Sequence, residues 1–368
     1  MKGLYVHIPF CIKKCRYCDF NSAVMPYDMQ EKYINALICE MSEYAGTKVD
    51  TVYIGGGTPT VLNTETLKNV IDGIKRHFNI LPNTEFTVEM NPKTADKEKC
   101  EMLLKSGVNR ISIGVQSFCD DELNQLGRVH SGKDAKDAIK LAKDIGFKNI
   151  SIDLMSAIPN QTPESFSQTL ETAILQNPDH ISCYSLILEE GTPLFDDVKS
   201  GKTVLCDEDT EREIYEYAVK NLEKNGYKQY EISNFAKDGK ESRHNIKYWT
   251  MQEYIGIGLS AHSFFEGVRF SNTDGFESYI SHNFRSGKKE ILTKSDMMSE
   301  FAFLGLRMTE GISETAFFEK FQADIFEVFK KPLEKFIKMG FLVNKDGRIF
   351  LSREGINVSN QIMCEFLL

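Results

Sequence analysis

The sequence of 368 residues has no apolar run that approaches the roughly 20 residues needed to cross a membrane. Its N-terminus also lacks the long apolar core and the small-residue cleavage site of a signal peptide. Basic residues are outnumbered by acidic ones, 44 to 53, which disfavours binding to nucleic acid because phosphate contacts depend on clustered Lys and Arg. We therefore expect a cytoplasmic protein with no integral membrane segment and no nucleic-acid partner, while peripheral contact with a membrane is left open.

The cysteines do not suggest a disulfide framework. There are nine of them, an odd number, and most lie singly, which suits a reducing compartment. Only Cys11, Cys15 and Cys18 form a cluster, and the scattered ones are Cys39, Cys100, Cys119, Cys183, Cys206 and Cys364.

What the chain does contain is a regular alternation of strand and helix signals. Each short β-branched run is followed by a segment with helical spacing, and this predicts parallel strands joined by right-handed crossovers. Either a barrel-like sheet or an open doubly wound sheet would satisfy the pattern, and in both the chemistry gathers at the C-terminal ends of the strands. The predicted strands are 4–8, 51–54, 85–89, 110–115, 150–154 and 181–187. Thr162 is expected to cap the helix after the fifth strand, with Pro163 at its first position.

The pattern changes after about residue 230. A Gly-rich stretch from 254 to 263 precedes a helical region, and two short strands near 341–343 and 348–351 resemble part of a winged-helix module. Such modules also serve as packing units, and no basic recognition face is evident in the sequence. We expect an α/β barrel over 1–230, a connecting region over 231–290 and a C-terminal α+β region with a winged-helix-like module over 291–368.

The cysteine cluster predicts an inorganic centre. Cys11, Cys15 and Cys18 fall in the loop after the first predicted strand, and three thiolates suit either zinc or iron and sulfide. Structural zinc takes four protein ligands and no fourth Cys or His follows at normal spacing, whereas a 4Fe-4S cluster on three cysteines leaves one iron open.

The spacing Cys-x3-Cys-x2-Cys, followed by Asp19-Phe20, resembles the signature of the radical S-adenosylmethionine (SAM) superfamily. The fold that this resemblance implies is a partial (β/α)6 barrel of the TIM type. It also implies that SAM chelates the open iron and that an electron donor reduces the cluster, the step that cleaves SAM in such proteins. Whether SAM is cleaved in the functional cycle of this protein is left open.

Polar and glycine residues after the other strands are candidates to bind SAM. Gly55-Gly56-Gly57-Thr58 would let backbone N–H groups approach a ligand closely. Glu89 and Gln116 can exchange hydrogen bonds with the ribose or the amino acid end, Arg128 can pair with the carboxylate, and Asp153 needs a partner because its strand is apolar. Taken singly, each has a structural alternative as a βα loop or a solvated strand end, and Tyr5 and Tyr17 can either line the pocket or simply pack.

These motifs together resemble the oxygen-independent coproporphyrinogen III oxidase superfamily over nearly the whole chain. That superfamily contains the oxidase, which decarboxylates two propionates, and the HemW-type heme chaperones, which pass heme to apo-proteins. The oxidase carries a further cysteine where this chain has Phe20, and a long N-terminal extension where only ten residues precede Cys11. Both departures disfavour the oxidase, which stays the alternative.

A second motif favours the chaperone group. His244-Asn245-Ile246-Lys247-Tyr248-Trp249 matches its His-Asn-x-x-Tyr-Trp pattern and contains the single tryptophan. The resemblance implies heme as cargo and apo-hemoproteins as acceptors. His244 is the candidate axial ligand, and Tyr248 and Trp249 are candidate aromatic contacts to the macrocycle. The alternatives are a polar loop histidine and a packed tryptophan.

Overall fold

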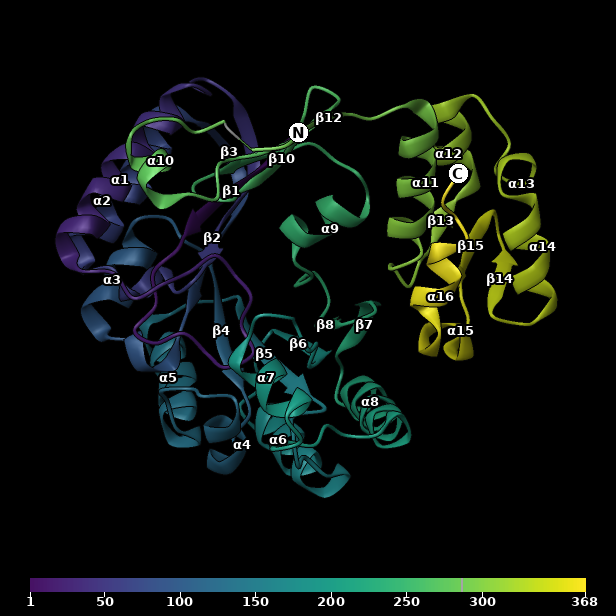
Figure 1. The fold of residues 1–368 in the computed structure, drawn as a ribbon, viewed down its shortest axis with the longest axis horizontal. Helices are drawn as coiled ribbons and strands as arrows, with labels where there is room; N and C mark the ends of the chain where they lie inside the picture. Colours follow the sequence, from purple (N-terminus) through teal and green to yellow (C-terminus); the bar gives the residue numbers. More distant parts are fainter. Residues whose placement is uncertain (286) are drawn as a thin grey trace.

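The structure is a computed structural model that describes residues 1–285 and 287–368, and its main element is a large sheet covered on one side by helices (Figure 1). Six strands pair in parallel and in chain order: β1 (Lys2–Ile8), β2 (Lys48–Gly56), β3 (Asn79–Met90), β4 (Arg110–Gln116), β5 (Ile150–Ser156) and β6 (His180–Ser185). They coincide with the six predicted strands and extend most of them by a few residues. The predicted α/β fold with a barrel-like parallel sheet is confirmed.

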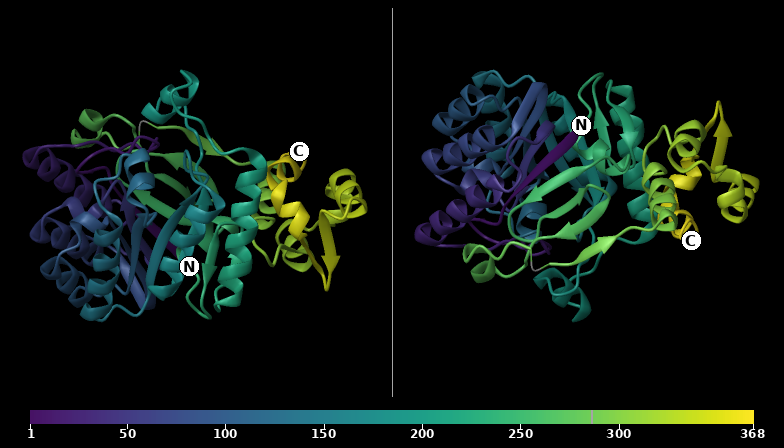
Figure 2. Two further views of the ribbon diagram at one scale, coloured as in Figure 1. Left: turned by 90° about the horizontal axis from the view of Figure 1, so that it is seen from below. Right: turned by 90° about the horizontal axis from the view of Figure 1, so that it is seen from above.

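Helices follow these strands and cover the outer face of the sheet (Figure 2). Helix α6 begins where the sequence indicates. The Thr162 hydroxyl caps its N-terminus, and Pro163 occupies its first position. The helices of this part are α1 (Tyr27–Ser42), α2 (Thr64–His77), α3 (Lys97–Lys105), α4 (Asp120–Gln125), α5 (Gly132–Ile145), α6 (Pro163–Leu175), α7 (Pro193–Lys199) and α8 (Glu208–Lys224), with 3-10 turns η1 (Pro59–Val61) and η2 (Pro92–Thr94).

The strands alternate in polarity because the two faces of the sheet meet different surroundings. On β4, Ile111, Ile113 and Val115 are fully buried in the apolar core shared with the helices. Arg110 and Ser112, which alternate with them along the strand, belong to the opposite face, which is the barrel interior. The interior is therefore polar, and this is where the candidate site lies.

Residues 231–290, predicted as a connecting region, extend the main sheet at both ends. Strand β9 pairs in parallel with β1, and β8 pairs antiparallel with β6. These strands are short and β9 is interrupted by glycine, so no strand pattern was evident from the residues alone. The elements are β7 (Lys228–Glu231), β8 (Asn234–Ala236), α9 (Arg243–Trp249), β9 (Tyr254–Ile257), β10 (His262–Phe265), β11 (Val268–Ser271), α10 (Phe276–Ile280) and β12 (Lys289–Ile291).

The C-terminal part has a core of its own and stands to one side of the sheet (Figure 2). Phe317, Phe329, Leu333, Ile349 and Phe366 are almost completely buried in it. Its small sheet has the order β13-β15-β14, as expected for a winged-helix-like module. The elements are α11 (Lys294–Gly305), β13 (Ile312–Ser313), α12 (Glu314–Phe321), α13 (Ile325–Val328), α14 (Lys330–Lys338), β14 (Leu342–Lys345), β15 (Arg348–Leu351), α15 (Arg353–Asn357) and α16 (Ser359–Cys364). Among the described residues, none of the helices has the length and apolar character that a bilayer span needs.

Candidate functional site

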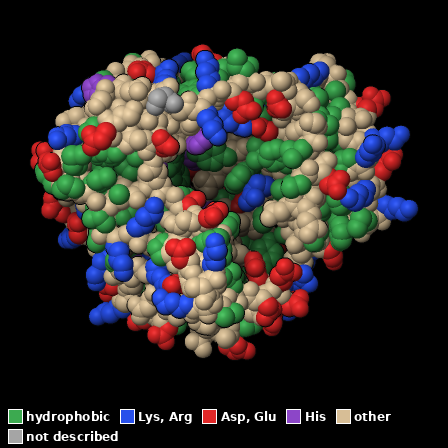
Figure 3. All heavy atoms as spheres, viewed as in Figure 1, with side chains coloured by type: hydrophobic (Ala, Val, Ile, Leu, Met, Phe, Trp, Pro, Cys, Tyr) green, Lys and Arg blue, Asp and Glu red, His purple; other side chains and the backbone are tan. Residues whose placement is uncertain are grey.

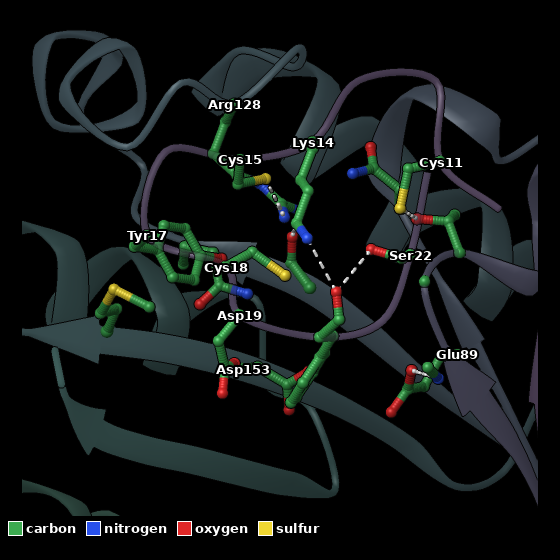
Figure 4. Close-up of a pocket in the computed structure, with 18 of the residues that line it drawn as sticks. Cys11, Lys14, Cys15, Tyr17, Cys18, Asp19, Ser22, Glu89, Arg128 and Asp153 are labelled. Carbon is green, nitrogen blue, oxygen red and sulfur yellow. Dashed lines mark hydrogen bonds between the residues drawn. The ribbon is translucent and has the colours of Figure 1, made fainter. Parts of the chain in front are cut away.

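The three clustered cysteines line a cavity of about 510 Å³ at the C-terminal ends of β2 to β6 (Figure 4). Most of the predicted SAM residues line the same cavity: Tyr17, Gly56, Gly57, Thr58, Glu89, Gln116, Arg128 and Asp153. Tyr5 and Gly55 are not part of its wall. Within the described chain, the thiols are arranged around this space and do not converge with other His, Cys, Asp or Glu groups on a single metal-ion position.

Charge around the thiols suits thiolate ligands. Arg128 Nη1 donates to Cys15 Sγ at 3.5 Å, and Thr58 Oγ1 lies 4.0 Å from Cys11 Sγ. Burial raises the pKa of Cys11 and of Cys18, so a ligand that needs thiolates must displace their protons. Among the described residues, Arg128 Nε is buried without a hydrogen-bond partner, which leaves one donor of this guanidinium unsatisfied next to the thiols. A 4Fe-4S cluster on the thiols, with an anionic ligand group beside Arg128, fits this donor set.

The cysteine loop is held in place from two directions. On one side, the Arg16 N–H donates to Leu126 O at 3.0 Å, and the Arg16 guanidinium forms an ion pair with Asp197. On the other side, Asn21 Nδ2 donates to Ser260 Oγ at 2.7 Å and to Asp274 O at 3.0 Å. The placement of the three thiols therefore depends in part on contacts between residues that are more than 230 positions apart in the chain.

The glycine segment differs from the prediction in how its N–H groups are used. The Gly56 N–H donates to Glu89 Oε2 at 3.0 Å, the Gly57 N–H to Ile8 O at 2.9 Å, and the Thr58 N–H to Phe10 O at 2.7 Å. These N–H groups already have acceptors within the protein. The segment can therefore contact a ligand mainly by van der Waals packing, and not by donating hydrogen bonds.

Packing explains why glycine is needed in this segment. A Cβ on Gly55 would lie 2.8 Å from the Glu89 carboxylate, and Gly56 has a φ of +111° with His7 directly against it. Gly55 therefore lies behind Glu89, outside the cavity wall.

The carboxylates of the cavity are buried. Burial raises the pKa of Glu89 to about 7, although hydrogen bonds from Tyr53 and from the Gly56 N–H oppose this. Burial also raises the pKa of Asp153, whose Oδ1 accepts a hydrogen bond from Ser112 Oγ at 3.4 Å. Two buried carboxylates beside an anion-binding arginine suit a ligand that carries both positive and negative groups.

The cavity wall also contains polar strand residues that the sequence did not single out. Tyr53, Ser112 and Tyr184 line it from β2, β4 and β6. Tyr184 donates to Gln116 Oε1 at 2.9 Å and so orients that amide. The signal for Tyr53 was its spacing of two from Gly55, which puts both residues on one face of the strand. By contrast, the predicted Tyr5 lies below the cavity wall, with its hydroxyl 3.0 Å from His7 Nδ1.

The histidine of the second motif is buried at the other end of the barrel, with 1% of its surface exposed. Its Nδ1 lies 2.9 Å from Thr51 Oγ1 and its Nε2 lies 2.8 Å from Tyr248 OH. Burial lowers the pKa of His244 to about 3, so the ring is neutral. Both ring nitrogens are engaged in this conformation. The assignment of His244 as an iron ligand stays a prediction that requires α9 to move.

Tyr248 and Trp249 line a second cavity, of about 310 Å³, between α9 and α11. The wall is mostly apolar and aromatic, with the Arg269–Glu300 ion pair at one side. Arg307 lies over the Trp249 ring, with its guanidinium carbon 4.4 Å from the ring centroid. Figure 3 shows hydrophobic side chains on the surface between the main sheet and the C-terminal helices. Asn245 lies in the first turn of α9, where Ser242 caps its N–H.

A buried carboxylate supports the segment that holds the cysteine loop. Glu40 is completely buried in α1 and accepts hydrogen bonds from Tyr279 OH, from Asn272 Nδ2 and from the N–H of Gly258. It thereby fixes the turn that precedes Ser260. Burial raises the pKa of Glu40 from 4.5 to about 7, against the effect of these three donors.

This pKa predicts a pH-dependent stability. Because the folded pKa of Glu40 lies above the unfolded one, the group favours folding below pH 4.5, and that contribution is lost as the pH rises through about 7. The loss amounts to ~3 kcal/mol for this one carboxyl. Glu40→Gln is therefore expected to reduce the fall in unfolding free energy between pH 5 and pH 8, as measured by urea denaturation. Glu31→Gln, which changes an exposed carboxylate in the same helix, should keep the wild-type profile, and equal profiles for all three proteins would contradict the assignment.

Comparisons with known proteins agree with this architecture. Residues 5–173 match the model of the radical SAM superfamily, and residues 292–358 match the HemN C-terminal domain. The fold resembles that of coproporphyrinogen III oxidase (HemN) from Escherichia coli, with a TM-score of 0.86 and 23% identity, covering 99% of this chain and 89% of that one.

Curated relatives extend over the full length. Heme chaperone HemW of Bacillus subtilis is 38% identical, covering 100% of this chain and 99% of the relative, and that of Escherichia coli is 34% identical, covering 95% and 96%. A zebrafish (Danio rerio) relative, radical S-adenosyl methionine domain-containing protein 1, mitochondrial, is 33% identical and covers 100% and 87%. Together with the radical SAM match around the cysteine cavity, this similarity shows that the chain belongs to the HemW family within the radical SAM superfamily.

Proposed function

We propose that this protein is a heme chaperone: it carries a 4Fe-4S cluster and SAM, binds heme and delivers it to apo-hemoproteins. The observation that carries the proposal is the full-length similarity to proteins named heme chaperone, at 33% to 38% identity in the bacterial relatives. The free state of all nine cysteines is in keeping with a cytoplasmic location.

In this proposal Cys11, Cys15 and Cys18 hold the cluster, which supplies one-electron reduction to bound SAM. Arg128 pairs with the SAM carboxylate and also donates a hydrogen bond to Cys15 Sγ. Glu89 and Asp153 face the positive groups of SAM, while Gln116 contributes an amide that Tyr184 holds in position. Phe20 lines the mouth of the cavity with 59% of its surface exposed, and an electron donor must approach this end of the barrel.

Heme is proposed to bind at the second cavity. Its aromatic and apolar wall suits a flat macrocycle, and Arg269 can meet a propionate once it leaves its ion pair with Glu300. His244 lies directly behind Tyr248 and can reach heme iron only if their hydrogen bond opens. The proposal therefore includes an outward movement of α9 when heme binds through His244.

One sample can test the proposal. Anaerobic reconstitution of the full chain is expected to give about four iron and four sulfide per chain. The same sample should bind SAM and show a Soret band on heme titration. It should form no protoporphyrinogen from coproporphyrinogen III with SAM and a reductant. Formation of that product, or a failure to bind heme, would contradict the chaperone proposal and favour the oxidase.

A further inference from the structure

Tyr53 contacts residues that serve both candidate sites. It lines the cysteine cavity, and its hydroxyl donates to Glu89 Oε1 at 2.8 Å. Its ring also stacks on the ring of His244, with centroids 5.3 Å apart and an interplanar angle of 29°. The Tyr53 hydroxyl is therefore held by a carboxylate of the cysteine cavity, and the face of the Tyr53 ring contacts the histidine of α9.

Helix α9 continues this contact to the second cavity. His244 Nε2 and Tyr248 OH are 2.8 Å apart, and Tyr248 is part of the wall of the second cavity. The ring of Tyr248 packs edge-on against Tyr254, with centroids 4.6 Å apart. Glu89, Tyr53, His244 and Tyr248 thus form an unbroken series of contacts between the two cavities.

The N-terminus of α9 is held by a second carboxylate from the same strand. Glu85 accepts hydrogen bonds from the N–H groups of Arg243 and His244, at 3.0 and 2.9 Å. A negative charge at this end of a helix is favourable, because the first N–H groups have no partner within the helix. Glu85 and Glu89 are four residues apart on β3, so they point to the same face of the strand. One strand therefore holds α9 and forms the wall of the cysteine cavity.

We propose that Tyr53 and α9 couple the two cavities: a cationic ligand beside Glu89 holds α9 in the seated position observed here, and release of α9 weakens the binding of that ligand. The reason lies in the Tyr53–Glu89 hydrogen bond. A positive group next to Glu89 favours the ionised carboxylate, and a hydrogen bond to an ionised acceptor is the stronger one. A firmly held Tyr53 keeps its ring against His244, and so favours the seated helix.

The coupling can be measured without heme. In wild-type protein with its cluster, saturating SAM is expected to slow hydrogen exchange of the α9 amides about fivefold or more, the lower end of usual coupling between sites. Tyr53→Phe keeps the ring and removes the hydroxyl, so the slowing should fall below about twofold. Tyr227→Phe is the matched control, because it removes one buried hydrogen bond, to Pro178 O at 2.9 Å, outside both cavities. It should keep the wild-type response.

Tyr248→Phe gives an independent check, because it breaks the contact with His244 Nε2 and leaves Tyr53 and Glu89 intact. This variant should show faster α9 exchange and, because a released α9 weakens the binding of the ligand beside Glu89, it should also raise the Kd for SAM. If Tyr53→Phe no longer binds SAM, Tyr248→Phe decides the question. The proposal is overturned if SAM leaves α9 exchange unchanged in wild-type protein, or if the variants respond as the wild type does.

A second measurement rests on the proposed function, because it uses heme. Heme binding requires α9 to open, whereas SAM favours the seated helix. Saturating SAM should therefore raise the Kd for heme about fivefold or more, and heme should raise the Kd for SAM by the same factor. In Tyr53→Phe, the ratio of the Kd for heme with SAM to the Kd for heme without SAM should approach one. Absence of heme binding would defeat the proposed function and leave the exchange result as the test of coupling. Heme binding that SAM does not affect would overturn the coupling alone.

Discussion

Cys15→Ala is expected to lose the iron–sulfur cluster almost completely. A cluster held by three cysteines already has one iron without a protein ligand, and removal of a thiolate would leave two. Cys15 is also the thiol that receives a hydrogen bond from Arg128, so its loss removes the thiolate next to the cationic group of the cavity. Anaerobic reconstitution should fall from about four iron per chain to well below one, with loss of the charge-transfer absorbance.

Cys364→Ala is the control for this experiment, because that thiol is exposed on the C-terminal α16 and far from the cavity in the chain. It should bind iron as the wild type does. Retention of full iron and sulfide by Cys15→Ala would contradict the assignment of the ligands. Stoichiometric zinc in the wild-type protein, in place of iron and sulfide, would contradict the cluster itself.

His244→Ala is expected to weaken heme binding tenfold or more and to lower stability together. The loss of heme affinity follows if the imidazole ligates iron. The loss of stability follows because the ring is buried, stacks on Tyr53 and satisfies Thr51 and Tyr248. Its removal leaves a cavity and two hydroxyls without their partner, at a cost of roughly 2–4 kcal/mol. Heme titration by absorbance and urea denaturation measure the two effects separately.

His180→Ala separates ligation from packing. His180 is equally buried in the barrel interior, and its ring nitrogens lie 2.8 Å from Ser151 Oγ and 2.8 Å from Tyr230 OH. Its loss should therefore reduce stability by a similar amount while heme affinity is kept. If both variants lose heme to the same extent, the effect comes from packing. Normal heme uptake by His244→Ala would rule out the ligand role.

The sequence predicted the parts of the fold that depend on local periodicity. Strands β1 to β6 were found because β-branched residues alternate with turn signals, and α6 because Thr162 and Pro163 mark its first turn. Most of the predicted SAM residues line the cavity for a related reason. Residues such as Glu89 and Asp153 lie at or near the C-terminal ends of parallel strands, and these ends meet at one edge of the sheet. Tyr53 was missed because a tyrosine within a strand gives no sign of which partner it will contact.

Features that depend on distant contacts could not be predicted in this way. The second cavity joins Tyr248 of α9 to Glu300 of α11, and no local pattern specifies that contact. The burial of His244 depends on Thr51 and Tyr53, about 190 residues earlier in the chain. The use of the glycine N–H groups by Glu89 and by the β1 backbone likewise depends on packing between strands.

The position of β1 between β2 and β9 has a consequence for synthesis of the chain. Strand β2 becomes available early, but residues 254–257, which pair with the other side of β1, follow some 250 residues later. At about 5–20 residues per second, a ribosome takes roughly 12–50 s to cover that distance. Throughout this interval one edge of β1 is bare and the cysteine loop lacks its anchor at Ser260. We therefore expect iron and sulfide to be inserted after translation is nearly complete, into a chain that must be protected from premature oxidation until then.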